Sequence, residues 1–269
     1  MTLTVPDTAA APSRLRPPRA FHLVERHLVI YRHTPMVLVA EIFEPVLYLL
    51  SVGVGIGALV GHVAGLGPSG VGYSAFVAPA LLATAAMNGA MNETTFNLLR
   101  KLKVDRIYDS VLSTPMSVQD LALGEVCWAL LRGTLTTTGF MAVTAAFGLV
   151  RSPWILLAVP GAALVGFGFA SVGLAVTTYL RGWQDFQYVQ LVMLPMFLFA
   201  TTFYPLGVYP RAVQIVVECL PLYQSIQLIR EPALGQVGPS LLVPAAYLVL
   251  MGLLGLAVAR RRLTLMLLH

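Results

Sequence analysis

The residues that could do chemistry are few, and many of the charged ones fall in one polar stretch, residues 96–120, which holds both lysines of the chain. Only 11% of the 269 residues are charged and 57% are hydrophobic, so this stretch stands out. Its apolar residues follow the i, i+3, i+4, i+7 spacing of a short amphipathic helix. From this spacing alone, the helix could bind either a protein or an anionic lipid surface. The apolar positions are Val104, Ile107, Tyr108 and Val111, flanked by Arg100, Lys101 and Asp109.

Nucleotide and metal chemistry find no support in the motifs. A phosphate-binding loop needs Gly-x-x-x-x-Gly-Lys followed by Ser or Thr, because backbone amides and the lysine hold the phosphates and the hydroxyl binds magnesium. Here the lysines are followed by Leu102 and Val104, with no glycine nearby. Cys127 and Cys219 have no Cys or His at metal-ligand spacing. We therefore expect no P-loop ATPase, metal site or disulfide framework in this chain.

Five ionisable residues lie inside apolar segments, where charges are costly unless they face protein or water. Glu125 and Arg132 share a helical face, but two turns separate them by about 10 Å, so each is expected to meet a partner on another helix. The carboxylates near Pro45 could relay protons or cations; pairing with neighbouring helices is the favoured interpretation. The five are Glu41, Glu44, Glu93, Glu125 and Arg132.

Long apolar runs predict an all-α integral membrane protein, since a span needs about 20 apolar residues. Thirteen of the seventeen Lys and Arg lie before the first span, after the second and fourth, and at the C-terminal end. Both termini are therefore expected in the cytoplasm, and the net charge of +5 orients the chain rather than binding nucleic acid. The Pro/Ala/Arg-rich residues 1–19 predict a disordered cytoplasmic tail. The six expected spans are 36–60, 71–93, 121–149, 154–179, 186–204 and 240–259.

Three further segments carry a structural prediction. Phe21, Val24, Leu28 and Tyr31 form an apolar stripe that predicts an amphipathic helix on the inner leaflet, with a continuous extension of span 1 as the alternative. Gly53, Gly57 and Gly61 recur every fourth residue and predict a helix-packing seam. Residues 211–220 and 222–231, separated by Pro221, are too short to span. They predict either two short helices re-entering the outer leaflet or an ordinary outer loop.

The chain resembles the membrane subunits of ABC-2 type exporters, in the branch of nodulation lipo-oligosaccharide and drug-export permeases. One difference is visible: the family pattern Ser-Gly-Thr-Phe-Phe-Pro after span 5 reads Ala200-Thr201-Thr202-Phe203-Tyr204-Pro205 here. The resemblance covers nearly everything beyond residue 20. Its motifs are Phe76-Val-Ala-Pro-Ala-Leu-Leu, Met87-Asn-Gly-Ala, Glu93-Thr-Thr-Phe, Tyr108-Asp, Thr114-Pro-Met-Ser, Leu123-Gly-Glu125, Trp128-Ala-Leu-Leu-Arg132-Gly, Gln184-Asp-Phe, Pro195-Met-Phe-Leu-Phe, Phe203-Tyr-Pro and Pro221-Leu-Tyr.

The resemblance implies an ABC-2 transmembrane domain over residues 20–269, with an interface helix before span 1 and re-entrant helices between spans 5 and 6. It implies a coupling helix after span 2, whose stripe seats in a separate ATP-binding subunit that holds ATP and magnesium. Two permease copies would export an amphipathic substrate, a lipid-linked oligosaccharide or hydrophobic drug, across the bacterial cytoplasmic membrane. The competing function is a proton-coupled secondary transporter using Glu41, Glu44 or Glu93. A membrane enzyme would need a catalytic cluster that the sequence does not offer.

Overall fold

The computed structural model describes residues 20–33, 35–60, 62–63, 71–103, 118–150 and 152–267. Almost all of these residues are helical, and two short strands, β1 (His62–Val63) and β2 (Val71–Gly72), pair antiparallel. The α-helices are α1 (Ala20–Arg32), α2 (Pro35–Tyr48), α3 (Gly57–Val60), α4 (Tyr73–Asn92), α5 (Leu98–Lys103), α7 (Val118–Ala146), α8 (Ala158–Thr177), α9 (Phe186–Phe199), α10 (Arg211–Glu218), α11 (Pro221–Ala233) and α12 (Leu242–Leu267). The π-helical segments are η1 (Leu49–Ile56) and η2 (Glu93–Asn97), and short 3-10 turns cover Pro153–Leu157, Trp183–Asp185, Leu206–Val208 and Pro239–Leu241.

Helices in the described part of the chain supply five segments long and apolar enough to cross a membrane. They correspond to the expected spans 1, 2, 3, 4 and 6, which supports an all-α multi-pass membrane protein. Their bounds are Val39–Leu59, Tyr73–Leu102, Asp120–Ala146, Pro153–Thr177 and Pro239–Leu265.

Span 5 differs from the expectation of a helix over 186–204. Helix α9 ends at Phe199 and is about 21 Å long, whereas the hydrocarbon core of a bilayer is about 30 Å thick. The chain turns away because Thr201 adopts a left-handed backbone conformation with φ 63°. Helices α10 and α11 follow and bend by 83° at Leu220–Pro221, so together they make either a broken sixth span or a re-entrant pair.

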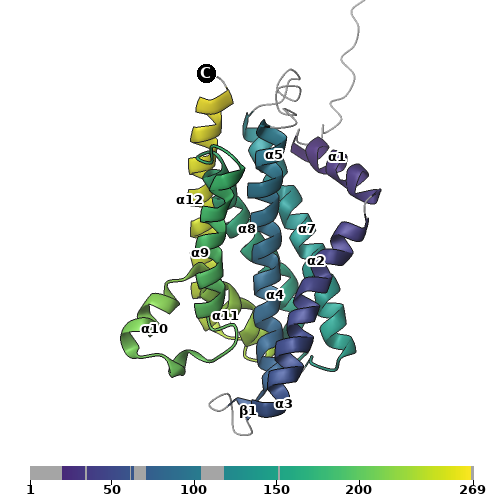
Figure 1. The fold of residues 1–269 in the computed structure, drawn as a ribbon, viewed down its shortest axis with the longest axis vertical. Coiled ribbons are helices and arrows are strands. Elements are labelled where there is room, and N and C mark those ends of the chain that lie inside the picture. The colour runs from purple at the N-terminus through teal and green to yellow at the C-terminus, as the bar shows by residue number, and fades with distance from the viewer. Residues whose placement is uncertain are drawn as a thin grey trace, which may run out of the picture.

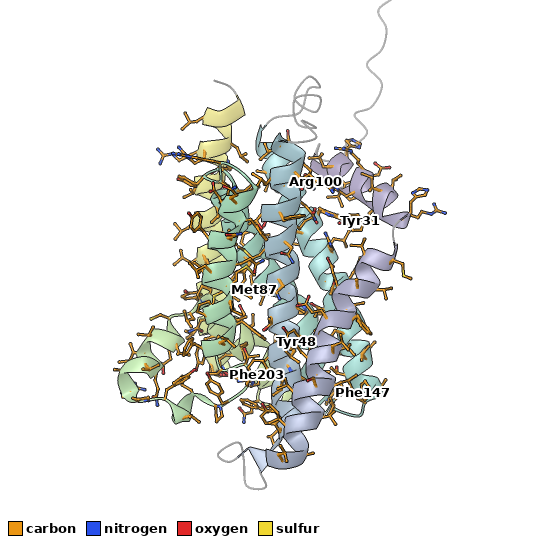
Figure 2. All side chains as sticks on the ribbon, viewed as in Figure 1. Tyr31, Tyr48, Met87, Arg100, Phe147 and Phe203 are labelled. Carbon is orange, nitrogen blue, oxygen red and sulfur yellow. The ribbon has the colours of Figure 1, made fainter. Side chains whose placement is uncertain are left out.

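Helix α4 forms the centre of the bundle (Figure 1), and sixteen of its twenty residues are buried. It contacts α7, α8, α11 and η1 around its circumference. Alanine dominates its sequence, and small side chains let neighbouring helix backbones approach closely. Figure 2 places Met87 of α4 midway along the bundle, with Tyr31 and Arg100 toward one end and Phe147 and Phe203 toward the other.

Glycines build the contact between α8 and α12. A methyl group placed on Gly255 would lie 2.8 Å from the backbone of Ser171 and Val172, and one on Gly168 would lie 3.3 Å from the carbonyl oxygen of Leu248. The two backbones therefore touch at a distance that only glycine allows. The sequence analysis did not single out these glycines.

The expected seam of span 1 packs on the start of α4. Ser74 Oγ donates a 2.6 Å hydrogen bond to the carbonyl of Gly53, and a methyl group on Gly57 would lie 3.3 Å from the same Oγ. The bond satisfies a carbonyl of η1, the π-helical stretch that begins four residues after Pro45. Gly61, the third expected member, lies outside the described residues.

Helices α1 and α2 are separate elements, since α1 ends at Arg32 and Pro35 opens α2. Helix α1 packs on α7 and crosses one end of the bundle at an angle to α2 (Figure 1). The face that packs on the bundle buries Leu23, Val24 and His27, whereas Phe21 and Leu28 of the predicted stripe are exposed. The contact of that stripe with the inner leaflet stays a prediction.

Candidate functional site

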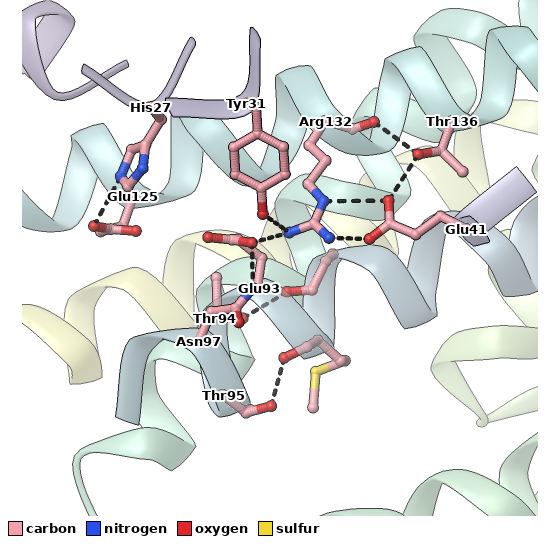
Figure 3. A network of polar contacts seen from close by, with 12 residues as sticks. His27, Tyr31, Glu41, Glu93, Thr94, Thr95, Asn97, Glu125, Arg132 and Thr136 are labelled. Carbon is pink, nitrogen blue, oxygen red and sulfur yellow. Dashed lines mark hydrogen bonds and ion pairs between the residues drawn. The ribbon is translucent and has the colours of Figure 1, made fainter. Parts of the chain in front are cut away.

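A buried charge network joins four helical elements at the end of the bundle that α1 and α5 occupy (Figure 1), and Figure 3 shows the contacts around Arg132. Three carboxylates and two permanent cations form its core, and the burial of most of them requires that they be paired. The core residues are Glu41 of α2, Glu93 of η2, Lys101 of α5, and Glu125 and Arg132 of α7.

Lys101 occupies one half of this network. Its Nζ donates to Glu93 Oε1 at 3.0 Å and to Glu125 Oε2 at 2.8 Å, and all three side chains are buried. Asn97 Nδ2 donates to the other oxygen of Glu93 at 2.7 Å. The ammonium thus links α5 both to its own preceding turn and to α7.

Arg132 occupies the other half. Its guanidinium forms ion pairs with Glu41 and with Glu93, and Nη1 also donates to Tyr31 Oη at 2.6 Å. Thr136 Oγ1 donates to Glu41 at 3.1 Å. A planar guanidinium has five N–H donors, so one side chain on α7 can hold α1, α2 and η2 at once.

Helix α1 joins the network through His27 and Tyr31. His27 Nε2 lies 3.3 Å from Glu125 Oε1, and its ring stacks on Trp128 with centroids 5.1 Å apart. The ring of Tyr31 also contacts Trp128, at 4.9 Å. Burial, assisted by the charge of Glu93, raises the pKa of Tyr31 to about 12, so this phenol stays neutral and keeps its place beside Arg132 at physiological pH.

A π-helical turn presents Glu93 to both cations. In η2 the wider turn departs from the regular ladder, and Thr177 of α8 donates a 2.6 Å hydrogen bond to the carbonyl of Thr94. Thr94 in turn donates to Ala90 O at 2.8 Å. Such π-helical turns inside α-helices are found frequently at functional sites.

The structure places the other predicted residues as follows. Lys101 was expected at the rim of a docking helix, but its ammonium is buried in the bundle, where it pairs with the carboxylates of Glu93 and Glu125. Arg100, its neighbour on α5, is exposed. Glu44 lies outside the network and lines a cavity between α2, α4 and α9. The predicted docking residues Val104, Ile107, Tyr108, Asp109 and Val111 lie outside the described residues.

Sequence reasoning missed His27, Asn97 and Trp128 as members of this network. A histidine on an amphipathic helix normally faces water, and only the packing of α1 on α7 brings it to Glu125. Asn97 follows Glu93 by four residues, a spacing that places two side chains on one helical face and could have suggested the pair.

Comparisons with known proteins agree with this architecture. Residues 19–234 match the family described as ABC-2 type transporter. Nodulation protein J of Rhizobium leguminosarum bv. viciae is 34% identical over 231 residues, which cover 84% of this chain and 87% of that protein. Nodulation protein J of Sinorhizobium fredii is 35% identical over 202 residues, 75% of each chain, and that of Bradyrhizobium diazoefficiens is 32% identical over 231 residues, 84% of this chain and 86% of the relative. The chain therefore belongs to the ABC-2 type transporter family and is a membrane component of an ABC exporter.

Proposed function

We propose that this chain is the permease of an ATP-driven exporter that moves an amphipathic substrate outward, while a separate ATP-binding subunit hydrolyses ATP. Membership of the ABC-2 family supports this proposal, as does the similarity to nodulation proteins J. The substrate class expected from the sequence, a lipid-linked oligosaccharide or a hydrophobic drug, is part of the proposal.

The observation that carries the proposal is the pairing of Lys101 with Glu125. Helix α5 ends at Lys103 and α7 begins at Val118, so this ion pair ties together the two helices that flank residues 104–117. A partner subunit that binds residues 104–117 would therefore move α5 and α7 together. Through Arg132 and His27 these two helices also reach α2 and α1.

The helices that lie at each end of the bundle also support the proposed orientation in the membrane. Helix α1, α5 and the C-terminal end of α12, with Arg260 to Arg262, lie at one end of the bundle, whereas α10 and α11 lie toward the other (Figure 1). Positive charge favours the cytoplasmic side. We therefore place the first group at the cytoplasm, with α1 as an interface helix, and α10 and α11 as a re-entrant pair in the outer leaflet of a homodimeric permease.

The test is the stimulation of ATP hydrolysis in the complex of this chain with its ATP-binding subunit. The double variant Ile107→Asp with Tyr108→Asp should abolish substrate-stimulated ATP hydrolysis, because charges would replace the apolar docking stripe. The matched double variant Ile107→Leu with Tyr108→Phe should retain it. Unchanged stimulation in the Asp variant, with both variants folded to the same extent, argues against docking at this segment.

A second experiment separates ATP coupling from proton coupling. The chain alone is reconstituted into liposomes with an imposed proton gradient, and uptake of an amphipathic dye is followed with and without the ATP-binding subunit. We expect transport only with the subunit and ATP. Transport driven by the gradient alone would instead assign the chain to the secondary transporters, with Glu41, Glu44 and Glu93 as the carboxylates to examine.

A further inference from the structure

A cavity of about 220 Å³ opens between α2, α4 and α9 and borders the charge network, because Glu41 and Thr136 belong to both. Glu44, Tyr48, Asn88, Gln190 and Phe197 are among its lining residues. Pockets that bury whole drug-sized molecules measure about 300–1,000 Å³, so this cavity has the size of a head group.

Glu44 gives the cavity its charge. The lining contains two carboxylates, Glu41 and Glu44, and no Lys, Arg or His among the described residues. Glu41 is compensated by Arg132, whereas Glu44 is exposed on α2 and has no ion pair or hydrogen bond within the described part of the chain. A carboxylate at membrane depth requires a cationic or hydrogen-bonding partner. A bound ligand can supply that partner.

Three carboxamides share the cavity with this carboxylate. Asn88 and Asn92 on α4 and Gln190 on α9 are in its lining; Asn92 and Gln190 are exposed, and within the described residues none of the three side chains makes a hydrogen bond. Their carbonyl oxygens are acceptors for N–H donors. The cavity thus offers acceptors of both kinds, charged and neutral, to one ligand group.

Aromatic and apolar side chains form the remaining wall. Tyr48 (labelled in Figure 2) meets Phe197 edge to face with ring centroids 5.9 Å apart, and Met193 and Leu194 continue the wall along α9. Aromatic faces attract ammonium groups.

We propose that this cavity binds the ammonium head group of a cationic amphiphile, with Glu44 as its counter-ion and the α2–α9 wall as the seat of its apolar body. The inference rests on the proposed export function and selects, of its two substrate classes, a hydrophobic drug that carries an ammonium group. An anionic head group, such as a phosphate, is excluded because Glu44 would repel it across a cavity whose lining holds no described cation. A glycoside head group would use the carboxamides but would leave Glu44 uncompensated.

The test measures binding of three single-chain amphiphiles, dodecylammonium, dodecyl maltoside and dodecyl phosphate, to the full chain in phosphatidylcholine nanodiscs by isothermal titration calorimetry. Each amphiphile also partitions into the nanodisc lipid, but it does so equally for every variant, so a difference between variants reports binding to the protein. Glu44→Gln should weaken dodecylammonium binding about tenfold, since it removes a charge-assisted contact, and should leave dodecyl maltoside unchanged. Tyr48→Leu should weaken dodecylammonium severalfold, and Glu218→Gln, a carboxylate outside the cavity, should change nothing.

Two outcomes overturn the assignment: dodecylammonium binding that does not respond to Glu44→Gln, or tighter binding of dodecyl phosphate than of dodecylammonium. Failure of the export function has a different signature. If dodecylammonium binding depends on Glu44 but no ATP-driven transport of any amphiphile occurs with the ATP-binding subunit present, the cavity is still an ammonium-binding site, and the export function is contradicted.

Discussion

The Nζ of Lys101 lies 2.8 Å from Oε2 of Glu125, and this contact joins two helices whose connection lies within the polar stretch 96–120. Both groups are buried, so neither can turn to water if the other is removed. The pair adds an ionic link between α5 and α7, while α5 also buries the apolar side chains of Leu98 and Leu99.

Loss of the Lys101 ammonium should destabilise the fold rather than affect only a docking surface. Lys101→Met leaves Glu93 and Glu125 buried without their shared cation, and breaking a buried pair costs about 3–5 kcal/mol. The free energy of unfolding in detergent, from thermal or denaturant melts, measures this loss. The double variant Lys101→Met with Glu125→Gln should lose less than the sum of the single variants. Full stability of Lys101→Met would mean that the ammonium lies in water.

Tyr31 should make stability depend on pH in the alkaline range. Its pKa is raised to about 12 in the folded state, from an unfolded value near 10. The folded state therefore binds more protons between these values, so the stabilisation present below pH 10 is lost as pH rises toward 12. Melting curves between pH 8 and 12 should show a smaller loss for Tyr31→Phe than for the parent. Tyr188→Phe, at an exposed ring, should follow the parent.

Thr201 carries a strained backbone that glycine would relieve. Its φ of 63° costs a non-glycine residue about 1–2 kcal/mol. Glycine would remove this cost, but its greater conformational entropy in the unfolded state offsets part of the stabilisation. Arg230 Nη2 donates to the Thr201 carbonyl at 2.8 Å, a contact that glycine retains, whereas the 3.5 Å contact of Nη1 with Thr201 Oγ1 is lost together with the buried side chain. The relieved strain offsets these losses, so Thr201→Gly should change the free energy of unfolding by less than about 1 kcal/mol.

The neighbouring threonine is the matched control for this substitution. Thr202 is buried, and its hydroxyl donates to the carbonyl of Phe197 at 2.9 Å. Thr202→Gly should lower the free energy of unfolding by about 1 kcal/mol or more, because a buried hydrogen bond and a packed side chain are lost. Equal destabilisation by both substitutions would contradict the left-handed turn at Thr201.

Gly255 should not tolerate even a methyl group. In Gly255→Ala the new Cβ meets the α8 backbone at 2.8 Å, so α8 and α12 must separate, at a cost of about 1–3 kcal/mol. Gly133→Ala on α7 has open space around the position and should be neutral or stabilising, since alanine favours helix. Thermal melts of the two variants in one detergent provide the comparison; an unaltered melt for Gly255→Ala contradicts the close contact.

Local signals were enough to predict much of the fold. The apolar runs predicted the helices that cross the bundle, and proline marked where α2 and α11 begin, because both signals act within one or two helical turns. The glycines at Gly53 and Gly57 were predicted to pack, and they lie against the start of α4. The expected end of span 5 was wrong by five residues, because a threonine occupies the left-handed position where the family pattern has glycine.

What the sequence by itself determined is the class of protein: an all-helical membrane chain with few charges, whose motifs mark the ABC-2 family. Periodicity and hydropathy determine the helical membrane class because they are properties of single segments, and the family follows from the resemblance of the motifs. The tertiary structure decided which charges are buried and with whom they pair. From the sequence, Lys101 is expected at the surface, but in the structure it pairs with Glu125, 24 positions away. His27 is likewise expected to face solvent, but the packing of α1 on α7 brings it to Glu125. Such pairings depend on how helices distant in sequence are placed, and no local pattern encodes that placement.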